Sequence, residues 1–252
     1  MDISVVVPFH NEEDHLEGCI DALRKLDYPR ERREIVMVDN NSTDRSVEIV
    51  RARPEVRLLS ESRPGDFAAR NRGIGSSTGE IVAFTDSDTA PRADWLHRIA
   101  EVMEDPEVMV VVGALRFGDG GGVMSWLAEY EAEKNRFIFS GEVPEIYYGY
   151  TCNMAVRRSV FNELGPFPEV FRNSDAVLVR KIVDHYSFGA AAYGEDVVVH
   201  RLEVADFVSY LRKQHTYGRD LGRYGEVANA RPLNTAERLE VFRRTARRGR
   251  FG

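Results

Sequence analysis

Acidic side chains follow three of the short apolar runs in this sequence, and they are the first residues that could do chemistry. Asp86-Ser87-Asp88 follows one run, Asp39 ends a second, and Glu12 follows a third. Two carboxylates spaced two residues apart repel each other, and a cation between them relieves the repulsion. Hard oxygen ligands in this arrangement suit Mg²⁺ or Mn²⁺, which commonly bridge to a diphosphate. The alternative is that Asp86 and Asp88 lie in a solvated turn and cap the next helix.

The apolar runs predict strands buried on both faces, because they are continuous rather than alternating. The segments between them carry apolar residues three and four positions apart, which predicts helices. Strand, helix, strand repeats of this kind predict right-handed βαβ units and a doubly wound, mostly parallel α/β sheet with helices on both faces. The expected strands are 3–7, 35–38, 56–59, 81–84 and 108–112, and the expected helices are 12–26 with Asn11 as its N-cap, 45–52, 66–74 and 93–103.

Ligand sites in open α/β sheets form at the carboxyl ends of the strands. Each of the acidic groups above comes at or just beyond the end of an expected strand. We therefore expect acids from three strands to meet at one edge of the sheet.

The chain changes character after residue 115. A glycine-rich break over 118–122 follows, and the last segment, 207–252, carries 11 Lys and Arg against 4 Asp and Glu. We divide the chain at these changes into 1–115, 116–206 and the C-terminal helical extension 207–252. The later expected elements are helices 123–139, 176–186 and 207–224, strands 147–150, 152–156 and 197–200, and a turn-rich stretch over 161–172.

The composition excludes several classes of protein. Of 252 residues, 43% are hydrophobic, which is enough for a sizeable core, and a net charge of −7 argues against a nucleic-acid binder. The two cysteines, Cys19 and Cys152, are too few and too far apart for a disulfide scaffold, a zinc ribbon or a CxxC redox site. No signal peptide opens the sequence, and the longest apolar stretch, 108–115, is shorter than the roughly 20 residues that span a bilayer. These features predict a soluble, cytoplasmic protein.

Four motifs in a fixed order give the sequence a more specific resemblance. They lie after the first, second and fourth expected strands and on the helix over 66–74. Over residues 3–200 the sequence strongly resembles family 2 glycosyltransferases with a GT-A fold. The matching stretches are Val7-Pro8-Phe9-His10-Asn11-Glu12, Val38-Asp39-Asn40-Asn41-Ser42-Thr43-Asp44, Ala69-Arg70-Asn71-Arg72-Gly73 and Asp86-Ser87-Asp88, together with the acceptor-side motif Asn153-Met154-Ala155-Val156-Arg157-Arg158 and its followers Phe161, Gly165, Phe167 and Glu169.

The resemblance implies that the donor is a nucleotide-diphosphate sugar and that residues 1–115 form the half that binds it. Asp39 matches the position that meets the nucleoside, and uridine is the commonest donor nucleoside in the family. Pro8 and Glu12 would shape the same pocket, and His10 could lie under the nucleotide. A charge at a helix N-terminus is the alternative for Glu12.

The same resemblance assigns the diphosphate end of the donor. Arg70 lies on the segment that faces the diphosphate in relatives, and a guanidinium is the natural partner for that group. Asp86 would contact the ribose or the sugar, with Ser87 beside it, and Asp88 would reach a Mn²⁺ or Mg²⁺ ion that neutralises the departing diphosphate. His200, at the end of an expected strand, could complete the metal shell, and a structural histidine is its alternative.

Residues 116–206 would then form the acceptor-binding and catalytic half. Family 2 enzymes invert the anomeric centre, so a carboxylate must take the proton of the acceptor hydroxyl. Asp175 matches the position of that base, although Ser174 replaces the usual Glu or Gly beside it. The alternative is that Asp175 only caps or opens its helix, with Asp184 as a distant substitute for the base. The Q-x-x-R-W motif of processive synthases is absent from the sequence, which favours transfer of one sugar per encounter.

The basic extension 207–252 indicates a second partner. Its aromatic and aliphatic stripe is flanked by cations, which is typical of helices that lie on anionic membrane surfaces. The stretch 214–219 also resembles the corresponding region of membrane-associated relatives. A saccharide or lipid-linked acceptor, reached by a protein peripheral to the inner face of the membrane, fits this pattern. The alternative is a charged helix folded back on the domain.

Two other functions are alternatives to the transferase reading of the sequence. A nucleotidyltransferase needs a Gly-rich, basic loop after its first strand to hold a triphosphate, and residues 8–12 offer none. A non-catalytic nucleotide-sugar-binding or scaffold protein stays open, because Ser174 departs from the family pattern beside the expected base.

Overall fold

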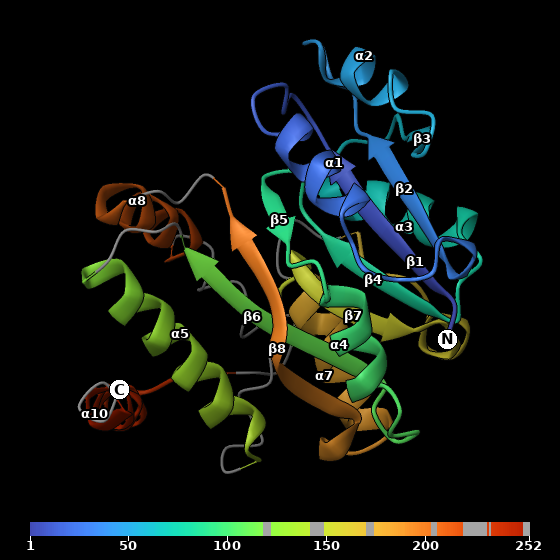
Figure 1. Ribbon diagram of the computed structural model, residues 1–252. Coiled ribbons are helices and arrows are strands. Elements are labelled where there is room, and N and C mark those ends of the chain that lie inside the picture. The colour runs from blue at the N-terminus through green and yellow to red at the C-terminus, as the bar shows by residue number, and fades with distance from the viewer. Residues whose placement is uncertain are drawn as a thin grey trace.

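The computed structural model describes residues 1–117, 122–141, 149–169, 174–202, 206–218, 231 and 233–248. In these residues one eight-stranded sheet runs through the molecule, and strands from both 1–115 and 116–206 belong to it (Figure 1). Its order is β3-β2-β1-β4-β7-β6-β8-β5. The strands are β1 (Ile3–Phe9), β2 (Arg33–Asp39), β3 (Arg57–Ser60), β4 (Ile81–Thr85), β5 (Thr89–Pro91), β6 (Val110–Phe117), β7 (Asn153–Arg157) and β8 (Ala191–Arg201).

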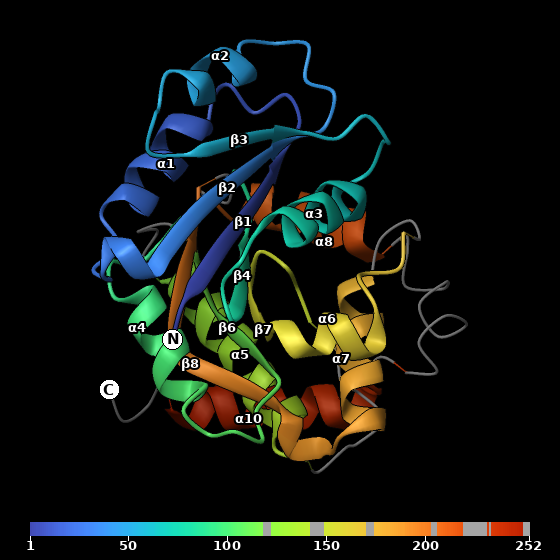
Figure 2. The same ribbon diagram turned by 90° about the vertical axis from the view of Figure 1, so that its right-hand side faces the viewer.

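Helices cover both faces of the sheet, as the sequence predicts (Figure 2). Of the helices in the described residues, three lie on one face and three on the other; one more lies beside β6 and β8, and the last two pack against it. In that order they are α1 (Leu16–Arg24), α2 (Ser46–Arg51) and α4 (Trp95–Val102); α3 (Asp66–Ser76), α6 (Arg158–Leu164) and α7 (Ser174–His185); and α5 (Val123–Phe139), α8 (Phe207–Gly218) and α10 (Thr235–Arg248). Short 3-10 turns cover Arg30–Arg32 and Phe188–Ala190.

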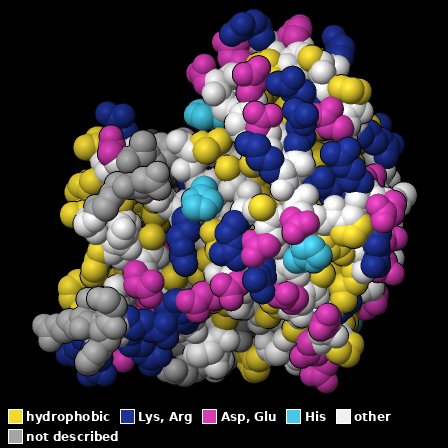
Figure 3. All heavy atoms as spheres, in the orientation of Figure 1, with side chains coloured by type: hydrophobic (Ala, Val, Ile, Leu, Met, Phe, Trp, Pro, Cys, Tyr) yellow, Lys and Arg dark blue, Asp and Glu magenta, His cyan; other side chains and the backbone are white. Residues whose placement is uncertain are grey.

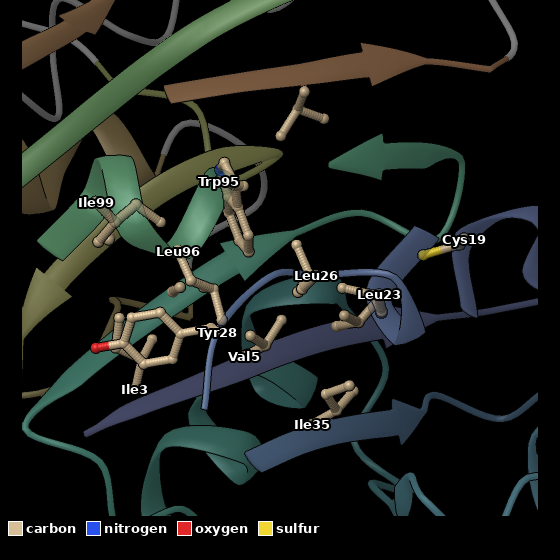
Figure 4. Close-up of a cluster of buried hydrophobic side chains, with 14 of the residues drawn as sticks. Ile3, Val5, Cys19, Leu23, Leu26, Tyr28, Ile35, Trp95, Leu96 and Ile99 are labelled. Carbon is tan, nitrogen blue, oxygen red and sulfur yellow. The ribbon is translucent and has the colours of Figure 1, made fainter. Parts of the chain in front are cut away.

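The continuous apolar character of β1 is explained by this two-sided burial. Ile3 and Val5 point into the cluster formed with α1 and α4, whereas Val6 points into the cluster on the opposite face. Figure 4 shows the first cluster, where Trp95 and Leu96 of α4 meet side chains of α1 and β1. Alternating side chains on a strand face opposite sides of a sheet, so a strand covered on both sides is apolar at nearly every position.

Two of the later strands run antiparallel to their neighbours, whereas repeated βαβ units alone would give a parallel sheet. β3, β2, β1 and β4 run parallel to one another, but β7 lies antiparallel between β4 and β6. β6 then pairs with β8 in parallel, and β5 pairs with β8 antiparallel. The apolar run 108–112 could not reveal this insertion, because a strand buried on both faces has the same composition whichever way its neighbours run.

Asn153, the first residue of the acceptor-side motif, is a buried structural junction. Its Nδ2 donates to the main-chain oxygens of Ala114 and Val197, each at 2.8 Å, and its Oδ1 accepts from Trp95 Nε1 at 2.9 Å. The side chain has no exposed surface, so these bonds satisfy groups that would otherwise be costly to bury. Gly113 makes room for it, since a Cβ there would lie 2.4 Å from Asn153 Nδ2.

The two arginines that end the same motif bind the C-terminal ends of helices. Arg157 Nη2 donates to Met103 O at 2.6 Å, just beyond α4, and Arg158 Nη1 donates to Ile74 O at 3.1 Å in α3. A cation at this end of a helix satisfies unpaired carbonyls and opposes the helix dipole. These two arginines therefore connect the end of β7 and the start of α6 to the ends of α4 and α3.

The first helix begins at Leu16, so the prediction that Asn11 is its N-cap is wrong. Asn11 has φ +52°, and its Oδ1 accepts instead from Thr43 N at 2.8 Å in the loop after β2. Asparagine tolerates this left-handed conformation better than most residues. Glu12 N likewise donates to Ser46 Oγ at 2.8 Å. The loops after β1 and β2 are therefore joined side chain to main chain.

Other boundaries shift by a few residues or lie outside the described chain. The short strand expected at 197–200 is the end of the longer β8. Residues 149–150 are not strand, and 147–148 lie outside the described residues. The helix expected over 207–224 is described as far as Gly218.

Candidate active site

The carboxyl ends of β1 and β2 bring the expected nucleoside-binding residues together. Asp39, 8% exposed, accepts from Ser42 N at 3.0 Å through Oδ1. His10 Nδ1 donates to Asn40 O at 2.8 Å, which leaves the proton on Nδ1. Pro8 is buried in β1 opposite Val38, one residue before Asp39 on the neighbouring strand.

The side chain of Asn40 fixes the loop that leads to α3. Its Nδ2 donates to Glu61 O at 2.9 Å and to Arg63 O at 2.7 Å, and its Oδ1 accepts from Gly65 N at 2.8 Å. Gly65 has φ +121°, a conformation that side chains disfavour. The loop therefore enters α3 in one defined geometry, which sets where Arg70 lies.

Glu12 lies in the turn before α1 and not inside the helix. Its Oε2 lies 3.0 Å from His15 Nδ1, and its main-chain oxygen accepts from the N–H groups of His15 and Leu16. Its charge also helps to raise the pKa of the Cys19 thiol, so it acts electrostatically on the acidic edge. Both the pocket-shaping role and the helix N-terminal role are compatible with this position.

Arg70 and Asp86 form a close ion pair at the end of β4. Arg70 Nη2 donates to Asp86 Oδ1 at 2.6 Å, and the arginine is 4% exposed. Ser87 and Asp88, at 5% and 8% exposed, are buried beside them. Burial raises the pKa of Asp86, the Arg70 charge opposes that rise, and the Asp88 charge adds to it. Asp88 is therefore buried, while Asp86 keeps 29% of its side chain exposed and is paired with Arg70, so neither carboxylate lies in a freely solvated turn.

Arg201 is a residue of the candidate site that the sequence did not reveal. Its Nη2 lies 3.4 Å from Asp88 Oδ2, and the next residue, Leu202, donates its N–H to Asp88 O at 2.8 Å. His200, the predicted ligand, is exposed and precedes Arg201 in β8. Because successive strand side chains point to opposite faces, the structure brings Arg201 rather than His200 to Asp88. Strand alternation could have identified Arg201 only if the face of β8 had been known.

Asp175 lies in the first turn of α7, within electrostatic reach of Arg70 and Asp86. Its Oδ1 accepts from Ala176 N at 2.9 Å and its Oδ2 accepts from Thr151 N at 3.2 Å. Burial raises the pKa of Asp175 to about 6; the Arg70 charge opposes this rise and the Asp86 charge adds to it. A carboxyl group with a pKa near the working pH is suited to general base chemistry.

Asp184, the substitute candidate for the base, lies at the other end of α7. It pairs with Arg180 there, 3.0 Å from Arg180 Nε, with 55% of its side chain exposed. An exposed helix pair of this kind is a common surface feature. The helix therefore presents Asp175, and not Asp184, to the acidic edge.

Both cysteines are buried against the acidic residues. Cys19 Sγ donates to Asp86 O at 3.6 Å, and burial raises its pKa. Burial likewise raises the pKa of Cys152 to about 12, with Asp86 and Asp88 adding to the rise. Both thiols are therefore protonated at neutral pH, and a protonated thiol is a poor nucleophile.

The metal-ligating side chains at this site fit a divalent cation that is shared with a substrate. Within the described residues, no three His, Cys, Asp or Glu side chains are grouped so as to hold a metal by themselves. Mg²⁺ is commonly held by only one or two carboxylates, with substrate phosphates completing the shell. Asp88 supplies a buried hard oxygen ligand, and its charge raises the pKa of Asp86, a repulsion that a cation would relieve.

Comparison with known proteins identifies the family of this chain. Residues 4–165 match the Glycosyl transferase family 2 profile, and the chain belongs to that family. It is 33% identical over 172 residues to the glycosyltransferase AglE of Haloferax volcanii, a match that covers 66% of this chain and 56% of AglE. It is 25% identical over 214 residues to the probable glycosyltransferase YdaM of Bacillus subtilis, covering 75% of this chain and 49% of YdaM. The chain thus spans about half the length of these two relatives.

Solved structures confirm the predicted GT-A fold. The mannosyltransferase PcManGT from Pyrobaculum calidifontis, solved with GDP-Man and Mn²⁺, matches with a TM-score of 0.73 and 23% identity, over 96% of this chain and 68% of PcManGT. The glucosyl-3-phosphoglycerate synthase of Mycobacterium tuberculosis, solved with Mn²⁺, UDP-glucose and phosphoglyceric acid, matches with a TM-score of 0.62 and 21% identity, over 92% and 81% of the two chains. At these identities the likeness is one of fold.

Proposed function

We propose that this protein transfers one sugar from a nucleoside-diphosphate sugar to an acceptor hydroxyl, with inversion at the anomeric carbon. The observation that carries the proposal is the ion pair between the buried Arg70 and Asp86 beside Asp88, with a carboxyl of raised pKa, Asp175, within electrostatic reach. The first three groups can hold a diphosphate and its cation, and the fourth can take a proton. Family membership supports the reaction class.

In the proposed reaction, the acceptor oxygen attacks the anomeric carbon as the bond to the diphosphate breaks. The electron pair of the broken bond leaves with the diphosphate, and the hydroxyl proton passes to Asp175. Arg70 would bind the departing group as its charge grows. A Mn²⁺ or Mg²⁺ ion held by Asp88 would neutralise part of that charge.

His200 is proposed as a metal ligand only in a rearranged site. Its side chain lies on the opposite face of β8 from Arg201, so the end of the strand would have to twist when the donor binds. A His200→Ala variant tests this directly by Mn²⁺ titration in the presence of UDP. Tenfold weaker Mn²⁺ binding supports the ligand role, and unchanged binding excludes it.

The donor nucleoside is proposed to be uridine, with Asp39 accepting hydrogen bonds from the base or ribose. Pro8, near the end of β1, would line the same pocket together with His10 and Glu12 in the loop that follows. Solved relatives hold UDP-GlcNAc, UDP-glucose or GDP-Man, which supports the donor class without choosing among its members.

Release of the free nucleoside diphosphate tests the proposed reaction. Purified protein is incubated with UDP-, GDP- and dTDP-sugars and Mn²⁺, alone and with acceptor extracts, and the anomeric configuration of any product is determined. We expect turnover with one donor and an inverted product, and we expect Asp175→Asn to abolish it while donor binding persists. Donor binding without turnover in the unaltered protein would favour the non-catalytic alternative.

We propose that the acceptor is a lipid-linked or membrane-surface glycan, reached through an exposed apolar surface on α8. This α8 surface consists of Leu202, Phe207, Val208 and Leu211, which are 39–55% exposed. On the other side of the helix, Tyr210 packs against α5. Figure 3 shows hydrophobic side chains gathered over this part of the molecule. The surface begins beside the site, because the N–H of Leu202 binds Asp88 O.

Exposed cations accompany the α8 surface. Arg212 follows it on α8, while Arg243 and Arg247 lie on the outer face of α10, whose inner face packs on α5 through Val241. The C-terminal extension can therefore fold back on the domain and still present a basic outer face. Apolar and basic side chains together suit anionic headgroups at the inner, cytoplasmic face of a membrane. None of the described helices combines the length and apolar character that a membrane span requires.

Co-sedimentation with vesicles tests this partner. We expect binding to phosphatidylcholine vesicles containing phosphatidylglycerol, weakening with salt, and lost in Phe207→Ser/Leu211→Ser. The matched control is Phe188→Ser, which removes a ring of similar exposure (50%) on a different surface. Equal binding by the double variant and the unaltered protein would refute the α8 surface as the membrane contact.

A further inference from the structure

The side chain of Asn71 on α3 binds both main-chain groups of a residue 96 positions away. Asn71 Nδ2 donates to Phe167 O at 2.8 Å, and Asn71 Oδ1 accepts from Phe167 N at 3.0 Å. The amide thus acts on Phe167 as a neighbouring strand would. Asn71 directly follows Arg70, so one turn of α3 holds Asp86 through one residue and the acceptor-side chain through the next.

The segment that Asn71 holds is also fixed by packing and charge. The Phe167 ring is 1% exposed and lies 5.3 Å from the ring of Phe84 in β4. Two residues on, Glu169 accepts from Arg63 Nη1 at 2.8 Å. Residues 167–169 are therefore tied at both ends to the donor-binding half of the chain.

Ser174 connects this segment to the proposed base. Its hydroxyl donates to Pro168 O at 2.5 Å, and the side chain has no exposed surface. Ser174 is the first residue of α7, and Asp175 is the next. Position 174, where the sequence departs from its family pattern, thus carries an anchor for the start of α7. The connection runs from Asn71 through Phe167 and Pro168 to Ser174, beside Asp175.

We propose that Asn71 and Ser174 are positioning residues that hold Asp175 in register with the Arg70–Asp86 pair. This inference rests on the proposed function of Asp175 as the base. Neither residue needs to touch the reacting atoms; each acts through segment 167–169. A displacement of about 1 Å at a reacting group can cost on the order of 100-fold in rate.

Steady-state kinetics distinguish positioning from general stabilisation. We expect Asn71→Ala and Ser174→Ala each to lower kcat roughly 10- to 100-fold, to leave the donor KM within about twofold, and to shift the acidic limb of the pH profile. Ser174→Thr retains the hydroxyl and should recover most of the rate. Asn162→Ala removes an exposed asparagine from nearby α6 and is the matched control. Unchanged kcat and pH profile in both alanine variants, with only a lower Tm, would overturn the inference.

A double variant tests whether the two residues act through one segment. If they do, Asn71→Ala/Ser174→Ala should lose about as much kcat as the worse single variant, because the second change removes support already lost. Losses that multiply would contradict a shared segment.

Hydrogen exchange separates this inference from the proposed function, because it needs no substrate. Asn71→Ala should speed amide exchange at residues 176–178, at the start of α7, while Asn162→Ala should not. An unaltered protein without transferase activity contradicts the proposed function, and the exchange result still decides whether Asn71 positions α7. Unchanged exchange in Asn71→Ala overturns the positioning role.

Discussion

Arg70 Nη2 donates to Asp86 Oδ1 across 2.6 Å, and only 5% of the arginine side chain is exposed. A buried charge is tolerated when it is paired, and leaving one partner alone is costly. The pair therefore has two roles in this account: it stabilises the fold, and it keeps the Arg70 cation at the edge of the sheet where the diphosphate is proposed to bind.

Replacing Arg70 with alanine should destabilise the protein strongly. The change leaves the half-buried Asp86 carboxylate without its cation, so we expect a loss of about 1.5–3 kcal/mol in the free energy of unfolding at pH 7, partly recovered at low pH where Asp86 is protonated. Urea denaturation monitored by circular dichroism measures it. Arg98→Ala removes an exposed arginine from α4 pairs and is the control, with no resolvable change. Equal effects of the two variants would contradict the structural role of the Arg70 pair.

The pH dependence of the reaction should report Asp175. The pKa of this carboxyl is raised to about 6, so a base at this position loses activity as pH falls through that value. We expect kcat to fall tenfold per unit below about pH 6 and to level off above it. Asp175→Asn should lose at least about 100-fold in kcat. A rate that stays constant down to pH 4.5 would argue against Asp175 as the base.

The raised pKa of Asp175 should also make the free energy of unfolding depend on pH. Its pKa is about 6 in the folded protein against an ordinary value of 3.8, so between these pH values the folded state binds more protons than the unfolded state. The contribution of Asp175 to the free energy of unfolding therefore falls as pH rises from about 4 to about 6. Asp175→Asn should remove this component of the slope, measured by urea denaturation at several pH values. An identical slope in the variant would show that Asp175 does not titrate as described.

Asp39 should govern donor affinity more than turnover. Its carboxylate already accepts from Ser42 N through one oxygen, which Asn can imitate, so Asp39→Asn should fold normally. Loss of a charged acceptor facing the nucleoside should raise the donor KM roughly 10- to 100-fold with little change in kcat. Initial rates against donor concentration give both constants. A fall in kcat at unchanged KM would place Asp39 elsewhere in the mechanism.

The strands of residues 1–115 could be predicted because their apolar runs are continuous, which is typical of strands covered on both faces. Asp39, Asp86 and Asp88 could be placed for the same reason, since each follows such a run. The insertion of β7 could not be predicted, because burial on two faces carries no information about strand direction.

Residues that depend on distant partners were harder to predict. Choosing between His200 and Arg201 requires the face of β8 that meets Asp88, which is set by its pairing with β5 and β6. The anchoring role of Ser174 depends on the carbonyl of Pro168, which no local pattern reveals. Asn11 looked like a helix cap, but the neighbouring loop takes its side chain.

Nucleotide-dependent thermal stabilisation tests the central claim most directly. The unaltered protein and the Asp88→Asn variant are each melted with UDP, GDP, dTDP or CDP, with and without Mn²⁺. A ligand that binds only the folded state at about 100 times its Kd should raise Tm by roughly 5–10 °C. We predict that one nucleotide, UDP foremost, stabilises the unaltered protein only when Mn²⁺ is present, and that Asp88→Asn abolishes this shift. No shift with any nucleotide and metal would contradict a nucleotide-sugar site built on Asp39, Arg70 and Asp88.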